Sequence, residues 1–178
     1  MNPVNCHRKR KHSSRLGFTL VEICLVVGII SALMSVAIPG FLTLVWTAKR
    51  SETDTVMRNI SQAMIDYISQ NEKFPTDMGG GQSSLTGNLN PPAPVTGLKK
   101  QFLPKQPGWT SLAWEPSTFV YYHYYVYGYI SPTVAYFNVQ AASDLNGNGV
   151  AGWRLQTYTR NGLDWNMTQD IISPQNEW

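Results

Sequence analysis

Cysteine is scarce in this sequence, and it is absent from most of the chain. Only Cys6 and Cys24 occur among the 178 residues. A disulfide or a catalytic thiol within residues 25–178 is therefore excluded. Cys24 lies within an apolar run, where a thiol usually acts as a small apolar side chain.

The groups from which most active sites are built are also missing. Past residue 17 the only histidine is His123, and the sequence shows no histidine–carboxylate cluster, no nucleophile elbow and no phosphate-binding glycine loop. We therefore do not expect an enzyme. His123 lies in a predicted strand, where a lone histidine is more often a packing residue than a chemical one.

Two stretches near the amino terminus lack charged residues: the first lacks acids, and the second lacks both acids and bases. Residues 1–17 contain no acid, and residues 23–48 contain no charged side chain at all. The second stretch exceeds the roughly 20 residues needed to cross a bilayer. Positive charge before a membrane span stays in the cytoplasm, so the rest of the chain is expected outside. The basic residues of the first stretch are Arg8, Lys9, Arg10, Lys11 and Arg15.

A single acid, Glu22, stands between these two stretches. An ionised group inside a bilayer is costly and usually has a partner. A simple signal anchor does not need such an acid. A secretory signal peptide cut after Ala37 is a second interpretation, but the apolar run continues past that point to Trp46.

A third interpretation rests on the segment Gly-Phe-Thr-Leu-Val-Glu at residues 17–22, which resembles the cleavage motif of type IV prepilins. The resemblance to the type IV pilin and pseudopilin family implies cleavage between Gly17 and Phe18 and N-methylation of Phe18. It implies that Glu22 pairs with the amino terminus of an adjacent subunit during assembly. Pro39 matches the family's proline partway along the span, and we expect it to kink or locally melt the helix.

The resemblance further implies a structural subunit, major or minor, of a type IV pilus-like filament. Its partners are then copies of itself or other pilins, a prepilin peptidase and methyltransferase, and an inner-membrane assembly platform. The expected location is the bacterial inner membrane before assembly and a cell-surface or periplasmic filament afterwards. A type II secretion pseudopilin and a non-polymerising membrane-anchored binding protein are the alternatives.

No nucleic-acid partner is expected, although the formal net charge of the whole chain is +3. Cleavage after residue 17 removes five of the 14 Lys and Arg and leaves nine against 11 Asp and Glu. The basic residues thus act as a topology signal.

The chain is expected to have four parts: a cleaved leader at 1–17, a membrane-spanning and filament-core helix at 18–48, an amphipathic continuation at 49–73, and a globular head at 74–178. Apolar residues recur at helical spacing in the third part, so residues 18–71 are predicted to form one helix. The stripe consists of Val56, Met57, Ile60, Ala63, Met64, Tyr67 and Ile68.

The head is predicted to hold a three- or four-stranded antiparallel sheet packed on the helix, which makes the fold class α+β. Alternating patterns predict strands at 119–130, 134–142 and 152–159. The tyrosine-rich first strand is expected to be covered on both faces. Residues 74–118, rich in proline and glycine, read as a long irregular connection, and residues 160–178 as a tail whose tryptophans pack on the sheet.

One loop of the head matches the opening of an EF-hand-type calcium loop. Residues 144–149 read Asp-Leu-Asn-Gly-Asn-Gly, which makes calcium a possible cofactor. The twelfth position is Leu155 instead of glutamate, so the shell would need Asp164 or Asp170 to complete it. The alternative is a hairpin turn built on two Asn-Gly steps. The tentative ligands are Asp144, Asn146, Asn148 and Val150.

Some members of the family use a calcium-bound loop in place of the disulfide that staples the last segment of the head. The resemblance therefore makes calcium more attractive in a chain without head cysteines. If calcium is absent, something else must hold the last segment in place.

Overall fold

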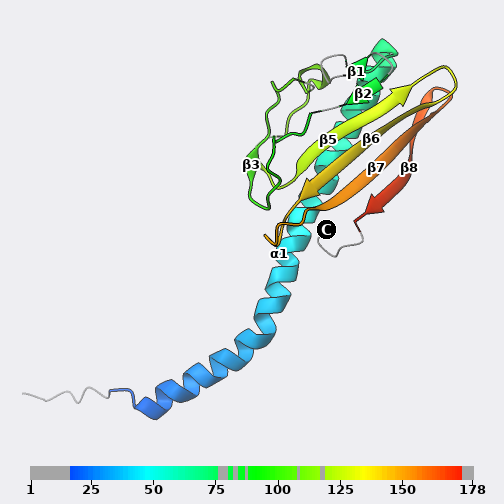
Figure 1. The fold of residues 1–178 in the computed structure, drawn as a ribbon. Helices are drawn as coiled ribbons and strands as arrows, with labels where there is room; N and C mark the ends of the chain where they lie inside the picture. The colour runs from blue at the N-terminus through cyan, green and yellow to red at the C-terminus, as the bar shows by residue number, and fades with distance from the viewer. Residues whose placement is uncertain are drawn as a thin grey trace, which may run out of the picture. The chain divides into compact units, whose positions relative to one another are not determined.

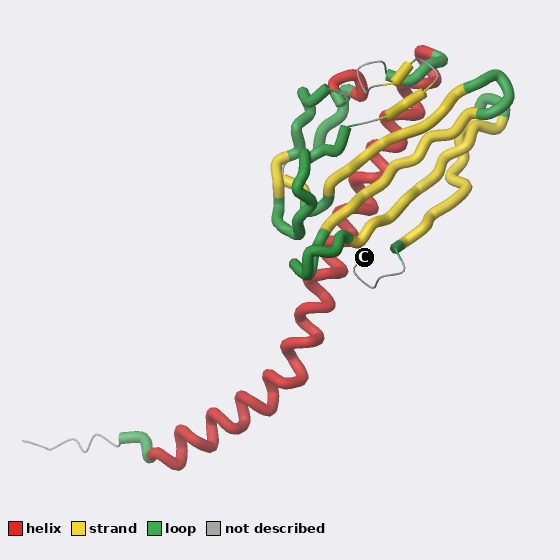
Figure 2. The backbone as a smooth tube through the Cα atoms, viewed as in Figure 1, coloured by secondary structure: helices red, strands yellow, loops and turns green. Residues whose placement is uncertain are grey.

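A computed structural model describes residues 17–75, 80–81, 84–86, 88–107, 109–116 and 119–173 (Figures 1 and 2). Most of the predicted leader, and Trp178 of the predicted tail, lie outside these residues. Contacts between Cα atoms divide the chain into two compact units, with the boundary between Thr43 and Leu44.

The first element is a long helix, α1, which runs from Leu20 to Asn71. It begins two residues later than predicted. It ends where Glu72 takes a left-handed backbone conformation, φ 54°, and donates its N–H to the carbonyl of Ile68 at 2.7 Å. This is a common way to end a helix, because it satisfies one of the last carbonyls.

The helix continues through Pro39. Local melting at this proline, one of the two outcomes predicted, is therefore not present in the structure. The hydroxyl of Thr43 donates to the carbonyls of Pro39 and Gly40, at 3.3 and 2.7 Å.

The head contains a six-stranded antiparallel sheet in the order β1-β2-β5-β6-β7-β8. Figure 2 shows its strands in yellow. Their bounds are β1 Gly80–Gly81, β2 Ser84–Thr86, β5 His123–Ile130, β6 Ala135–Ser143, β7 Gly152–Asn161 and β8 Asp164–Ile172. A second sheet pairs β3, Lys100–Gln101, with β4, Phe119–Val120, and a short 3-10 helix, η2, covers Thr110–Leu112. The α+β fold class is thus confirmed.

Three expectations about the sheet were wrong. It has six strands because two short segments of the predicted irregular connection join its edge. The predicted strand 119–130 is split, since the backbone N–H of Tyr121 donates to Glu52 Oε1 at 3.2 Å. The predicted tail is largely the strand β8.

The strand β8 escaped prediction because of its pattern and its turn. Eight of its nine residues are exposed and do not alternate with buried ones, so it lacks the signature of a half-buried strand. The signal that was present is the turn Asn161-Gly162, in which Gly162 has a φ of 66°. Such a step is typical of tight hairpins.

The predicted apolar stripe of the helix is confirmed as the centre of the core. Met57, Ile60 and Met64 are fully buried, and Ala63 and Tyr67 are partly buried. Figure 1 shows the upper part of α1 behind the sheet. The sheet contributes Tyr124, Val126, Phe137, Val139 and Tyr158 to the same cluster.

The predicted strand tyrosines are buried on the face toward the helix and only partly covered on the other. Tyr122 and Tyr124 are buried, whereas Tyr129 is 45% exposed. Trp165 packs on the ring of Phe137 at 5.1 Å between ring centroids, which confirms the expectation for this tryptophan of the predicted tail.

The connection between helix and sheet is irregular but anchored. The buried Asn90 exchanges two backbone hydrogen bonds with Tyr124, and its side chain bonds both the N–H and the carbonyl of Leu103. Near Gly97 the connection approaches the loop after β6, where an added Cβ would lie 2.2 Å from the carbonyl oxygen of Asp144. Only glycine fits there.

The buried stripe generates a stability prediction. Replacing Ile60, which is 0% exposed, with alanine leaves a cavity and should lower the free energy of unfolding by about 2–4 kcal/mol. The measurement is denaturant unfolding of the full chain in detergent. The control, Arg58→Ala on the exposed face, should change it by about 0.5 kcal/mol or less. Equal effects of the two substitutions would contradict this account of the core.

Candidate functional site

The predicted processing junction lies immediately before α1, and both of its residues, Gly17 and Phe18, are exposed. The side chain of Glu22 folds back onto Thr19. Its Oε2 accepts the backbone N–H of Thr19 at 2.8 Å and the Thr19 hydroxyl at 2.9 Å, while the N–H of Glu22 donates to that hydroxyl oxygen at 3.2 Å. This reciprocal arrangement is a capping box, which satisfies backbone donors at the start of a helix.

Glu22 therefore has a partner within its own chain. The spacing Thr-x-x-Glu was visible in the sequence, but the prediction concerned only the charge of Glu22. The residues of the junction and Glu22 are close together, whereas Pro39 lies about five helical turns further along α1.

The first unit of the chain presents an apolar surface with little cover. Every described residue from 17 to 43 is exposed, including Ile23, Leu33 and Phe41. Among the described residues α1 is the one helix long and apolar enough to cross a membrane, with a mean hydropathy of 2.5 in its most apolar window of 18 residues.

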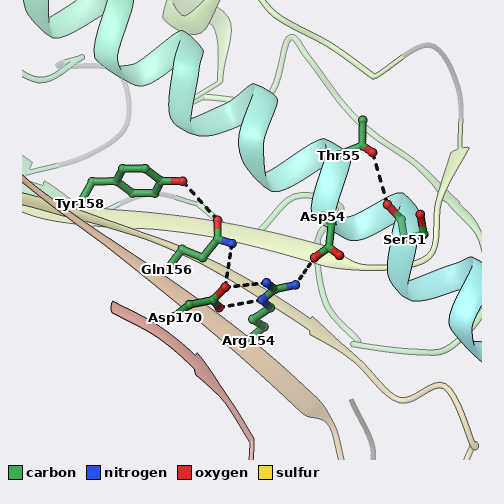
Figure 3. A network of polar contacts seen from close by, with 7 residues as sticks. All are labelled: Ser51, Asp54, Thr55, Arg154, Gln156, Tyr158 and Asp170. Carbon is green, nitrogen blue, oxygen red and sulfur yellow. Dashed lines mark hydrogen bonds and ion pairs between the residues drawn. The ribbon is translucent and has the colours of Figure 1, made fainter. Parts of the chain in front are cut away.

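A second cluster joins the helix to the last strands of the head, and we call it the Arg154 clasp (Figure 3). Arg154 on β7 donates Nε and NH2 to the carboxylate of Asp170 on β8, at 2.7 and 2.5 Å. Its NH1 donates to Asp54 on α1. Gln156 adds a bond to Asp170 at 3.3 Å and accepts one from Tyr158.

The electrostatics of the clasp favour its charged form. Hydrogen bonds from Arg154 lower the pKa of Asp170, and the reciprocal bond raises the pKa of Arg154. A bidentate guanidinium–carboxylate pair forms only in a narrow range of geometries. The clasp links α1, β7 and β8, so it holds the last described strand of a head that contains no cysteine.

The predicted calcium loop connects β6 and β7, and its side-chain oxygens bond the loop's own backbone. Asp144 accepts the N–H groups of Gly147, Asn148 and Gly149 at 2.8 to 3.1 Å. Asn146 accepts from Asn148 at 3.1 Å, and Asn148 accepts from Val150 at 2.7 Å. Gly147 and Gly149 have positive φ, as the hairpin-turn interpretation requires.

The residues around this loop do not complete a calcium shell. Asp164 lies beside the β7–β8 turn, at the other end of β7, and Asp170 is held by Arg154. Within the described residues no group of three or more histidine, cysteine or acidic side chains is placed to hold a metal. Calcium at this loop stays a prediction that no contact of the structure strengthens.

His123 is buried at 1% exposure and lies under the loop that carries Pro91. Its Nδ1 lies 2.6 Å from the carbonyl oxygen of Pro91, and its Nε2 has no hydrogen-bond partner. Burial lowers the pKa of His123, and the charge of Lys100 adds to this effect. This arrangement agrees with the expected packing role.

The comparisons with known proteins point to one group. Over 58 residues the chain is 34% identical to the type IV major pilin protein PilA of Myxococcus xanthus. That match covers 33% of this chain and 26% of the relative, so the chain spans about a quarter of the length of the relative it matches. No protein-family model matches the chain, and no solved structure matches it.

The long helix, apolar and exposed in its first part and packed on an antiparallel sheet in its second, defines an α+β protein with the layout of a pilin. Both this layout and the matched segment are similar to those of type IV pilins.

The Arg154 clasp generates a stability prediction. Arg154→Met leaves two facing carboxylates without their cation and should lower the free energy of unfolding by about 1–3 kcal/mol at neutral pH. Partial exposure of Asp54 and Asp170 places the value below that of a fully buried pair. Denaturant unfolding of the full chain measures it, with Arg160→Met as the matched control, because Arg160 is exposed and donates to the carbonyl of Gly162.

The difference between the wild-type chain and Arg154→Met should also depend on pH. Because the folded pKa of Asp170 is lowered, its stabilisation is complete above the unfolded value of about 3.9 and is lost as the pH falls through the folded value. A difference that persists unchanged to pH 2 would mean that the ion pair contributes nothing and only the packing of Arg154 matters.

Buried His123 generates a pH profile in the same direction, but at higher pH. Its folded pKa lies below the unfolded value of about 6.5, so the unfolded chain takes up the proton first as the pH falls. Stability is complete above this value and declines below it until the folded pKa is passed. Urea midpoints between pH 8 and 5 should show this decline, and His123→Gln should abolish it; a midpoint that rises on acidification would contradict the burial account.

Proposed function

We propose that this chain is a structural subunit of a type IV pilus-like filament, cut by a prepilin peptidase between Gly17 and Phe18 and methylated at Phe18. The observation that carries the proposal is the uncovered apolar surface of the first part of α1, placed directly after a Gly-Phe junction and Glu22. The similarity to a major pilin over 58 residues supports the same role.

An apolar surface of this extent is unfavourable in water, at about 25 cal/mol for each square ångström exposed. In the inner membrane the lipid chains cover it. In a filament the same surface is covered by the corresponding helices of neighbouring subunits, so the subunit can leave the membrane without exposing it. The head then lies outside the filament core.

Glu22 changes its partner in this proposal. Before assembly its carboxylate caps α1 through Thr19, as the contacts of the single chain support. After cleavage the new amino terminus at Phe18 of one subunit provides a positive charge for Glu22 of the next. Two opposite charges that are buried together set the register of neighbouring subunits, because either one alone is costly.

We propose that Pro39 assists assembly by weakening α1. Proline has no backbone N–H, so the carbonyl four residues earlier, at Ser35, lacks its usual helical donor. The helix is therefore weaker at this point, and we propose that it loosens there when subunits pack in the filament.

Assembly requires partners that the proposal names only by class: other pilin subunits, the processing enzymes and an inner-membrane platform. The proposed subunit moves from the inner membrane to a surface filament.

The test compares Glu22→Gln with Glu22→Ala. Glutamine can keep the capping box but carries no charge, whereas alanine loses both. Both variants should be processed, with Phe18 as the first residue by amino-terminal sequencing, and both should reduce the yield of sheared filaments at least tenfold. Ser31→Ala, an exposed polar change on the same helix, is the control and should assemble normally.

The outcomes separate the alternatives. Normal assembly of Glu22→Gln would show that capping is sufficient and charge pairing is wrong. Ile38 as the first residue of the wild-type chain would support the secretory interpretation. A wild-type chain that is processed at Phe18 but never sediments as a filament would support an anchored binding protein.

A further inference from the structure

A groove runs along the exposed side of the helix, between α1 and the loop around η2. It consists of two neighbouring cavities of about 520 and 500 Å³ that share Asn59 and Trp114 in their walls. The helix wall extends from Glu52 to Gln70, which corresponds to ~27 Å at 1.5 Å per residue. Each cavity has the size of a ligand site, and together they suit an elongated ligand.

Trp114 forms the central aromatic wall of this groove and is held in place before any ligand binds. Its ring packs edge-on against Phe102, with 5.7 Å between centroids. Phe102 in turn packs against the buried Trp109 at 5.1 Å. The half-buried Trp114 also lines a third cavity, of about 260 Å³, on the side of Lys105. A fixed indole face binds a ligand with a smaller loss of side-chain freedom than a mobile one.

The residue before Trp114 has a strained backbone. Ala113 adopts a left-handed conformation, φ 49°, at the end of η2, where alanine is disfavoured relative to glycine. Ala113 lines the larger cavity and the third cavity. Strain of this kind collects at binding sites, where it holds a side chain in position.

The helix wall opposite Trp114 carries amides and one carboxylate. Asn59, Gln62, Asp66 and Gln70 recur on one face of α1 and are all exposed. Gln62 donates to Asp66 at 2.9 Å, which orients both side chains. Amide and carboxylate groups offer neighbouring donors and acceptors, which match the paired hydroxyls of a sugar ring.

The charge of the groove restricts what can bind there. The described residues that line its two main cavities include Glu52, Asp66 and Glu115 but no lysine or arginine. The charge of Glu52 is partly balanced by Lys99 at 3.4 Å. The remaining negative field repels nucleic acids and acidic polymers. A peptide that binds as an added strand needs a free strand edge, which this groove of helix side chains and a loop does not offer.

We propose that the groove binds an uncharged polysaccharide chain, with sugar rings stacked on Trp114 and their hydroxyls bonded to Gln62, Asp66 and Asn59. Aromatic rings attract the apolar faces of sugars, and the amide row gives the hydroxyl contacts. The site belongs to the single chain and does not depend on filament formation. Its failure would leave the proposed assembly function untouched.

The experiment measures binding to the full chain in a detergent without a sugar headgroup, such as lauryldimethylamine oxide. The neutral probes are the pentasaccharides of N-acetylglucosamine, cellulose and starch, and the acidic probe is an oligogalacturonate of the same length. Calorimetry should give a Kd below about 1 mM for at least one neutral probe and at least tenfold weaker binding of the acidic probe.

Variants locate the binding. Trp114→Ala should weaken it at least tenfold, Trp114→Tyr should keep most of it, and Asp66→Asn should reduce the discrimination against the acidic probe. Trp153→Ala, a change of another half-buried tryptophan on β7, is the matched control and should bind as the wild-type chain does. Thermal melting of each variant shows whether a loss of binding comes from unfolding.

Three results would overturn the proposal: no binding of any neutral probe, unchanged binding by Trp114→Ala, or tighter binding of the acidic probe. If Trp114→Ala melts early, Gln62→Ala, which leaves the aromatic packing intact, decides the matter. Unchanged affinity in that variant would also overturn the proposal.

Discussion

The structure depends on one constraint: a single helix must carry two different apolar surfaces. From Val56 to Ile68 the apolar side chains form a narrow stripe that the sheet buries, and polar residues cover the rest of the helix. From Phe18 to Leu44 the apolar side chains surround the helix and remain exposed. An apolar stripe can be buried within one chain, but a helix that is apolar all round can be buried only by lipid or by other helices. The proposed membrane association and the proposed filament both follow from this difference.

The head solves a different problem, which is how to hold its last strand without a disulfide. Arg154, on β7, binds Asp54 of α1 and Asp170 of β8. The bulge between Thr157 and Tyr158 shifts the register of β8 further along the strand, so Trp165 can pack on Phe137. The Arg154 clasp near one end of β8 and the packing of Trp165 near the other together hold the strand on the sheet.

The parts that sequence alone could predict are those with a local period. The helical stripe and the strands β6 and β7 show clear repeats of 3.6 or 2 residues, and the structure has them close to the expected bounds. The strand β8 lacks such a repeat, and β1 and β2 are too short to have one. The clasp joins residues 100 and 16 positions apart, so it depends on a strand register that no local pattern contains. The proposed junction at Gly17 and Glu22 rests on a contiguous motif that the sequence alone shows, whereas the groove at Trp114 needs the fold to bring helix and loop together.

The capping box at Thr19 has a consequence for the order of events at the membrane. A carboxylate that is hydrogen-bonded to its own helix has a lower free-energy cost in the bilayer than an isolated carboxylate, even before an adjacent subunit is present. In a filament built as proposed, subunit addition is then an exchange of one hydrogen-bonded partner for another, and a subunit that returns to the membrane regains the first partner. The capping bonds therefore lower the cost of a Glu22 that has no filament partner, both before a subunit joins the polymer and after one leaves it.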